Sequence, residues 1–155
     1  SFLSYRSVFM PPFTPIFIPG LLCTEFLFAK QRAALPNAGL IGDTTQHDSI
    51  NEMAQFALDQ CTGALVPVGF SMGGYVALEM ARLAPERIAG MALLSTNVGV
   101  DSDERANDRR QAIKLATHKG FKGINRSFLS QFISKTALVD SVLADNILAI
   151  LAVGL

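Results

Sequence analysis

The sequence predicts an α/β fold in which a mostly parallel, doubly wound sheet is followed by a layer of helices. Over residues 1–100, short apolar runs bounded by glycine or proline alternate with segments that have the apolar spacing of helices. Beyond residue 100, the pattern indicates helices alone. The chain has 155 residues, half of them hydrophobic, which is enough for one domain with a buried core.

Four apolar runs are expected to form the strands of the sheet. They are residues 15–18, 40–42, 64–70 and 88–96. The last run is apolar on both faces, as a parallel strand covered by helices must be. Pro67 is an anomaly in the third run, because proline cannot donate a hydrogen bond to a neighbouring strand. We expect a bulge or a slight displacement of that strand.

Helices are expected between these strands and after the last of them. The second helix should begin just after Ser49, because Ser49 and Glu52 have the spacing of a capping box. Pro85 should end the third. The expected helices cover residues 25–35, 50–60 and 73–83, and then 103–117, 124–134 and 137–153.

Charge and cysteine content exclude several classes of function. The 13 Lys and Arg side chains balance 13 Asp and Glu, so no overall charge favours nucleic acid. Cys23 and Cys61 have no metal-ligand spacing, which indicates a reducing compartment and predicts no metal site. The opening residues lack the pattern of a signal peptide, and Asp140 and Asp145 interrupt the last apolar run. We therefore expect a cytoplasmic protein without a membrane or nucleic-acid partner.

The chemistry is predicted from residues 69–74, Gly-Phe-Ser-Met-Gly-Gly, where a strand should end and a helix begin. This GxSxG pattern in that context is typical of a nucleophile elbow, a tight turn that exposes a serine hydroxyl above the sheet. Ser71 is the predicted nucleophile, and Gly69, Gly73 and Gly74 leave room for the turn. The plainer interpretation is a glycine-rich turn in which the serine only caps the helix. The spacing of a phosphate-binding loop is absent.

An oxyanion that forms at Ser71 needs hydrogen-bond donors. The first expected donor is the N–H of Met72, at the start of the following helix. The second is the N–H of Leu21, in the loop after the first strand. Without Ser71, the Pro19-Gly20 pair before Leu21 would be taken as an ordinary turn.

Three segments carry a resemblance to a known family: IPGLLCTEF at 18–26, TTQHDSINEMA at 44–54 and VGFSMGGYVALEMARLAPERIAGMALLST at 68–96. With them the chain resembles the α/β-hydrolase superfamily, in the serine esterase branch that includes pimeloyl-carrier-protein methyl ester esterases. The resemblance implies a Ser–His–Asp triad, no cofactor, a helical cap inserted in the core, and a small ester or acyl thioester as substrate. Pro19-Gly20 replaces the usual His-Gly of the family without removing the backbone donor.

The triad partners of Ser71 are not evident. In this family the acid and then the histidine follow the serine, but His118 ends a predicted cap helix and His47 precedes Ser71. Asp101 is the nearest downstream acid, in a segment more typical of a solvated helix start. We therefore expect an N-terminal fragment of low activity. Residues 1–100 would form part of the core and residues 101–155 an incomplete cap, with the remaining core strands absent.

Two alternatives to an ester hydrolase remain open. An acyltransferase or a carbon–carbon bond hydrolase could use the same scaffold, because a fold does not determine a reaction. A ligand-binding module without catalysis could keep the pocket and lack the triad.

The C-terminal third of the chain contains a long stretch with basic side chains and no acidic ones. Between residues 109 and 139 there are seven Lys or Arg and no Asp or Glu. Such a run could be a solvated helix face, or it could attract an acidic acyl carrier protein or a carboxylate-bearing substrate. The seven residues are Arg109, Arg110, Lys114, Lys119, Lys122, Arg126 and Lys135.

Overall fold

The computed structural model describes residues 12–117, 129–130 and 133–152. Its centre is a parallel sheet of four strands in the order β2-β1-β3-β4. The sheet confirms the predicted α/β class, and each strand lies within or overlaps its predicted run. The strands are β1 (Phe13–Ile18), β2 (Leu40–Ile41), β3 (Ala64–Phe70) and β4 (Ala92–Leu94).

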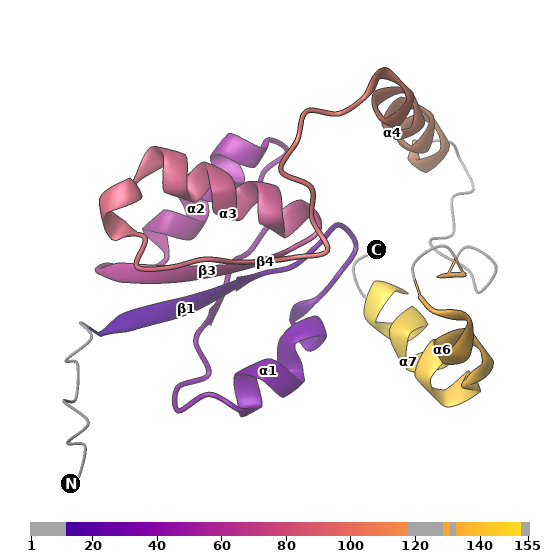
Figure 1. Ribbon diagram of the computed structural model, residues 1–155, viewed down its shortest axis with the longest axis horizontal. Helices are drawn as coiled ribbons and strands as arrows, with labels where there is room; N and C mark the ends of the chain where they lie inside the picture. The colour runs from indigo at the N-terminus through magenta and orange to yellow at the C-terminus, as the bar shows by residue number, and fades with distance from the viewer. Residues whose placement is uncertain (1–11, 118–128, 131–132, 153–155) are drawn as a thin grey trace, which may run out of the picture.

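Helices cover both faces of the sheet, as a doubly wound arrangement requires (Figure 1). On one face lie α2 (Ile50–Asp59) and α3 (Met72–Leu83), and on the other lies α1 (Ala29–Ala33). The helix predicted over residues 25–35 begins with a 3-10 turn, η1 (Glu25–Phe28), before α1. A second 3-10 turn, η2 (Pro85–Arg87), follows α3 and leads into β4.

The core is the apolar layer between the sheet and the pair α2 and α3. Its side chains come from alternate positions of β1 and β3 and from the inner faces of the two helices. On the opposite face, the rings of Phe17 and Phe28 lie 5.1 Å apart and both are buried. The core residues are Ile16, Ile18, Met53, Ala54, Ala57, Leu58, Leu65, Val76, Ala77 and Met80.

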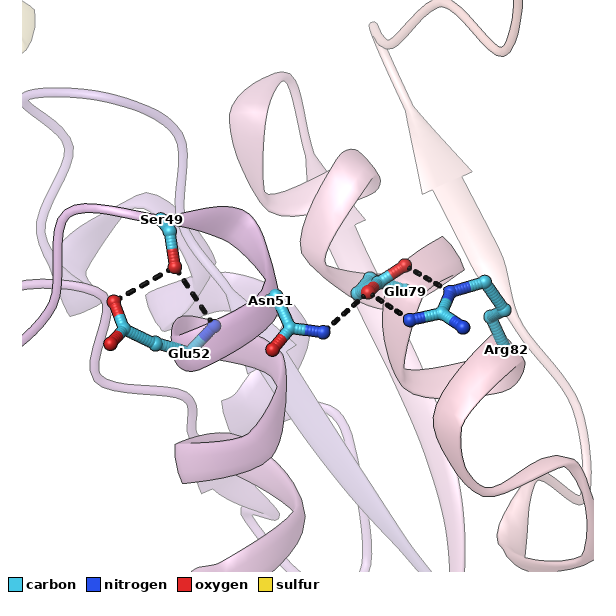
Figure 2. Close-up of polar contacts among 5 residues, drawn as sticks. All are labelled: Ser49, Asn51, Glu52, Glu79 and Arg82. Carbon is cyan, nitrogen blue, oxygen red and sulfur yellow. Dashed lines mark hydrogen bonds and ion pairs between the residues drawn. The ribbon is translucent and has the colours of Figure 1, made fainter.

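Polar contacts fix the start of α2 and its surface contact with α3 (Figure 2). The Ser49 hydroxyl accepts the Glu52 N–H at 3.2 Å and donates to the Glu52 carboxylate at 2.8 Å, which confirms the predicted cap. Asn51 donates to Glu79 of α3 at 2.8 Å, and Arg82 donates to the same carboxylate. The two helices are therefore joined both by the core and by this surface network.

Pro67 is accommodated differently from the prediction. The pairing of β3 with β1 is continuous through Ile16 and Pro67, so β3 has neither a bulge nor a displacement there. The irregularity lies in the chain on the other side, where Leu65 pairs with Ile88 and Val68 with Ala92. Between these two pairs β3 advances by three residues and the neighbouring chain by four, so the extra residue is in the chain before β4. The regular pairing is interrupted there because proline has no N–H to donate.

The fourth strand is shorter than predicted and is not buried on both faces. Regular pairing covers Ala92–Leu94 alone within the predicted run 88–96, and Leu94 is exposed. Two features explain the difference. The extra residue opposite Pro67 interrupts the hydrogen bonding between β3 and β4 before Ala92, and β4 is an edge strand in the described part of the sheet.

The helical layer comprises α4 (Asp103–Ala116), α6 (Lys135–Val139) and α7 (Ser141–Ala152), which lie to one side of the sheet (Figure 1). The helix expected over 103–117 is confirmed, whereas most of the one expected over 124–134 falls outside the described residues. The helix predicted over 137–153 is in fact two helices. Asp140 separates them, because its carboxylate accepts the N–H of Leu143 and caps α7.

Candidate active site

Ser71 lies between the last residue of β3 and the first of α3, at the carboxyl edge of the sheet. Its backbone has φ of 52° and ψ of −116°, which residues with a side chain rarely adopt. Its N–H donates to the carbonyl of Leu94 at 2.9 Å, and its carbonyl accepts the N–H of Gly74 at 2.9 Å. Although Ser71 occupies the N-cap position, its hydroxyl makes no capping hydrogen bond. The plainer interpretation of this serine as a helix cap therefore lacks its defining contact.

The three predicted glycines allow close backbone approach at this turn. A Cβ atom on Gly69 would overlap the carbonyl oxygen of Gly73, and one on Gly73 would overlap the carbonyl oxygen of Ile18. A Cβ on Gly74 would lie 2.5 Å from the hydroxyl oxygen of Thr96. Each of these positions thus has no room for a side chain. The three glycines allow the ends of β1 and β3 and the chain after β4 to contact the start of α3.

The loop after β1 lies directly beside Ser71. A Cβ placed on Gly20 would be 3.2 Å from the Cβ of Ser71. Gly20 accepts the N–H of Cys23 in a tight turn, with Leu22 at a φ of 61°, and partial burial raises the pKa of the Cys23 thiol. Leu21 follows Gly20 in this turn. The two segments that carry the predicted oxyanion donors Leu21 and Met72 therefore meet at Ser71, and the convergence of their N–H groups stays a prediction.

His47 is not placed as a partner of Ser71. His47 follows β2, which β1 separates from β3, and its exposed ring contacts that of Phe56 in a tilted arrangement with the ring centres 5.2 Å apart. It is the sole histidine in the segments that the structure describes, because His118 lies outside them. The candidate acid Asp101 is paired with Arg109, with 2.7 Å between the Arg109 Nε and a carboxylate oxygen.

A polar cluster of Tyr75, Asp101 and Arg109 joins α4 to α3, and we call it the cap clasp. Arg109 of α4 donates to the hydroxyl of Tyr75 at 3.1 Å, and its guanidinium carbon lies 5.6 Å from the centre of that ring. The hydrogen bond with Asp101 raises the pKa of Arg109. These residues and Gly99 line an open hollow of about 350 Å3.

The cap clasp changes the interpretation of the basic run. Arg109 is the first residue of the basic run, and in the structure its charge is offset by Asp101. The first turn of α4 is also acidic, with Asp103 and Glu104. Arg110 and Lys114 are exposed on the same helix, and Lys135 is exposed at the start of α6. The other expected cations, Lys119, Lys122 and Arg126, lie outside the described residues.

Two residues of this region were missed in the sequence. Tyr75 lies one helical turn after Ser71, and that spacing was the available signal. Thr96 donates from its hydroxyl to the carbonyl oxygen of Ser71 at 2.8 Å, and its distance of 25 residues along the chain gave no signal.

A parallel sheet with a strained serine at a strand–helix turn defines the class of the chain as an α/β hydrolase-like protein. Comparison with known proteins agrees. The model of the alpha/beta hydrolase fold family matches residues 29–124, more than half of the chain. The chain therefore belongs to this family.

Among curated proteins, the chain is similar to the pimeloyl-[acyl-carrier protein] methyl ester esterase of Photobacterium profundum. The two are 42% identical over 50 residues, which cover 32% of this chain and 20% of that protein. The match therefore spans a small part of the relative.

Solved structures show the same fold. A thermophilic esterase from Thermogutta terrifontis superimposes with a TM-score of 0.69 and 21% identity, covering 93% of this chain and 61% of that one. Est816, an N-acyl homoserine lactone degrading enzyme, superimposes with a TM-score of 0.62 and 20% identity, covering 91% of this chain and 57% of that one. The chain thus spans about three fifths of the length of these structures. Within the described residues, none of the helices has the length and apolarity needed to cross a bilayer.

Proposed function

We propose that this chain carries the nucleophile of a serine-dependent hydrolase that cleaves carboxylic esters or thioesters through an acyl-enzyme. The observation that carries the proposal is the state of Ser71. Its backbone is held in a strained turn at the carboxyl edge of the sheet, while its hydroxyl is not used to cap α3. Strain of this kind is costly and is concentrated at active sites and ligand-binding sites.

In the proposed reaction, Ser71 Oγ attacks the substrate carbonyl carbon and gives its proton to a general base. The N–H groups of Met72 and Leu21 stabilise the oxyanion of the tetrahedral intermediate. The alcohol or thiol leaves with the proton, and water then hydrolyses the acyl-serine. The residues that the structure describes do not supply the base, so this role stays unassigned.

A fluorophosphonate probe tests the nucleophile, because it reacts with an activated serine to give a stable phosphonylated product. The intact gene product that contains this chain should be labelled at Ser71, and the Ser71→Ala variant should not. Ser95→Ala is a matched control, because Ser95 is an exposed serine that also has a positive φ, of 47°. Equal labelling of wild type and Ser71→Ala would contradict the proposal and favour a non-catalytic binding module.

We also propose that the substrate is a small ester or an acyl group presented by an acidic carrier protein. The support is the match to a carrier-protein esterase over 50 residues and the exposed cations Arg110 and Lys114 on α4. Charges of this kind act chiefly on the rate of encounter and are screened over about 8 Å at physiological salt.

The carrier protein is tested by reversing these charges in the intact gene product. Arg110→Glu combined with Lys114→Glu should lower kcat/KM for a carrier-bound ester and leave a small neutral ester unaffected. Lys30→Glu is the control, because Lys30 is exposed on α1 at the other face of the sheet. A parallel loss with both substrates would exclude carrier recognition by this surface.

A further inference from the structure

The strained backbone of Ser71 is held by the end of β4 and the two residues that follow it, residues 94–96. The Ser71 N–H donates to the carbonyl of Leu94, the last residue of β4. The Ser71 carbonyl accepts the hydroxyl of Thr96 at 2.8 Å, in a partly buried position. Both backbone polar groups of the serine are therefore bonded to a segment of three residues from a different strand.

The Thr96 side chain is also packed directly on the first turn of α3. A Cβ atom added to Gly74 would lie within 2.5 to 2.6 Å of three of its atoms, Oγ1, Cβ and Cγ2. Gly74 thus gives the space that Thr96 occupies. Because the same residue contacts α3 and bonds to Ser71, its hydroxyl has little freedom to turn away.

The peptide between Ser71 and Met72 connects this contact to the chemistry. A peptide group is planar, and in the trans form its C=O and N–H point in opposite directions. The structure has no cis peptide bond among its described residues. Thr96 and Gly74 both donate to the Ser71 carbonyl, so they also fix the direction of the Met72 N–H, which points away from them.

We infer that Thr96 is a positioning residue, whose hydroxyl holds the Ser71–Met72 peptide so that the serine hydroxyl and the Met72 N–H face the substrate together. This inference rests on the proposed function of Ser71. It adds a role for a residue that acts through its contacts with Ser71 and Gly74. The hydroxyl acts on the geometry of the nucleophile and of one oxyanion donor, and its removal should slow acylation and leave substrate binding unchanged.

Two variants separate the hydroxyl from the packing of the side chain. Thr96→Val keeps a branched side chain against Gly74 and loses the donor, whereas Thr96→Ser keeps the donor and loses the methyl group. In the intact gene product, Thr96→Val should lower kcat and the rate of fluorophosphonate labelling about fivefold, the effect of one net hydrogen bond of ordinary strength. KM for a small ester should stay the same, and Thr96→Ser should label at nearly the wild-type rate.

A second measurement does not depend on activity. In Thr96→Val, the amide hydrogens of Ser71 and Gly74 should exchange faster with solvent, while those of β1 and the middle of β3 stay protected. Wild-type labelling and unchanged exchange in Thr96→Val would overturn the inference, as would equal losses in the valine and serine variants. If wild-type Ser71 is not labelled at all, the proposed function fails, and the exchange measurement still decides whether Thr96 holds the turn.

Discussion

The sheet with its covering helices and the helical layer beside it are stabilised in different ways. Between the sheet and α2 and α3, side chains such as Ile16, Leu65 and Met80 are fully buried. In the described part of the layer, Val139 and Val142 are 84% and 69% exposed, and α4 is joined to the core by the polar contacts of the cap clasp. Buried apolar area fixes the first region strongly. The described part of the layer also buries Leu129 and Ala144, but the contact of α4 with the core consists of half-exposed polar groups, which add little to stability.

The largest effect should come from removing apolar side chains in the two regions. Leu65→Ala should lower the free energy of unfolding by about 2–5 kcal/mol, because it leaves a cavity in a closely packed core. Val142→Ala should change the same quantity by under about 0.5 kcal/mol, because its side chain is mostly in solvent. Urea unfolding of each purified variant measures both. Similar losses in the two variants would mean that the layer is packed as tightly as the core.

A smaller effect is expected from the cap clasp. Arg109→Ala removes the ion pair with Asp101 and the hydrogen bond with Tyr75. The side chains of Arg109 and Asp101 are 50% and 30% exposed, so the free energy of unfolding should fall by under about 1 kcal/mol. Amide hydrogens of α4 should exchange faster, with no change in β3. The neighbouring Arg110→Ala is the control and should leave exchange in α4 unaltered. If α4 is equally protected in both variants, the clasp does not hold this helix.

The same contrast explains what could be predicted from the sequence. Strands and helices of the core have an apolar period set by burial, so β3, α2 and α3 were found to within a residue or two. Ser49 and Glu52 are three residues apart, and their capping contacts follow from local chain geometry. The strand–helix turn at Ser71 was located for the same reason, because its glycines and its serine are adjacent in sequence, and the role of Ser71 as nucleophile stays a prediction.

The contacts that were missed join residues distant in sequence. Thr96 reaches Ser71 because Phe70 pairs with Leu94, and this register depends on the whole sheet. Arg87 donates to three carbonyls that follow or end α2, those of Leu58, Cys61 and Gly63, and no local pattern indicates such a set. Pro67 is a source of irregular strand pairing, as predicted. The sequence could not indicate that the extra residue would be in the chain before β4, because that depends on which strand pairs with β3.

The smallest predicted effect concerns the surface contact of α2 with α3. Hydrogen bonds from Arg82 and Asn51 lower the pKa of Glu79 from 4.5 to about 2 (Figure 2). Because this pKa is lower in the folded state than in the unfolded one, the unfolded chain takes up the proton first as the pH falls. The stabilisation from Glu79 is therefore complete above its ordinary value of 4.5 and is lost as the pH falls through about 2.

Glu79→Gln tests this by mimicking the protonated side chain at every pH. The urea midpoint of the variant should lie slightly below that of the wild type at about pH 6, and the difference should shrink as the pH approaches about 2.5. Added salt should reduce the difference at the higher pH, because the contact is on the surface. Glu86→Gln, at an exposed carboxylate of η2, serves as the control and should show no such convergence. A difference between wild type and Glu79→Gln that is constant over this pH range would show that the ionised carboxylate does not join α2 to α3, and the contact of these helices would then depend on their buried face alone.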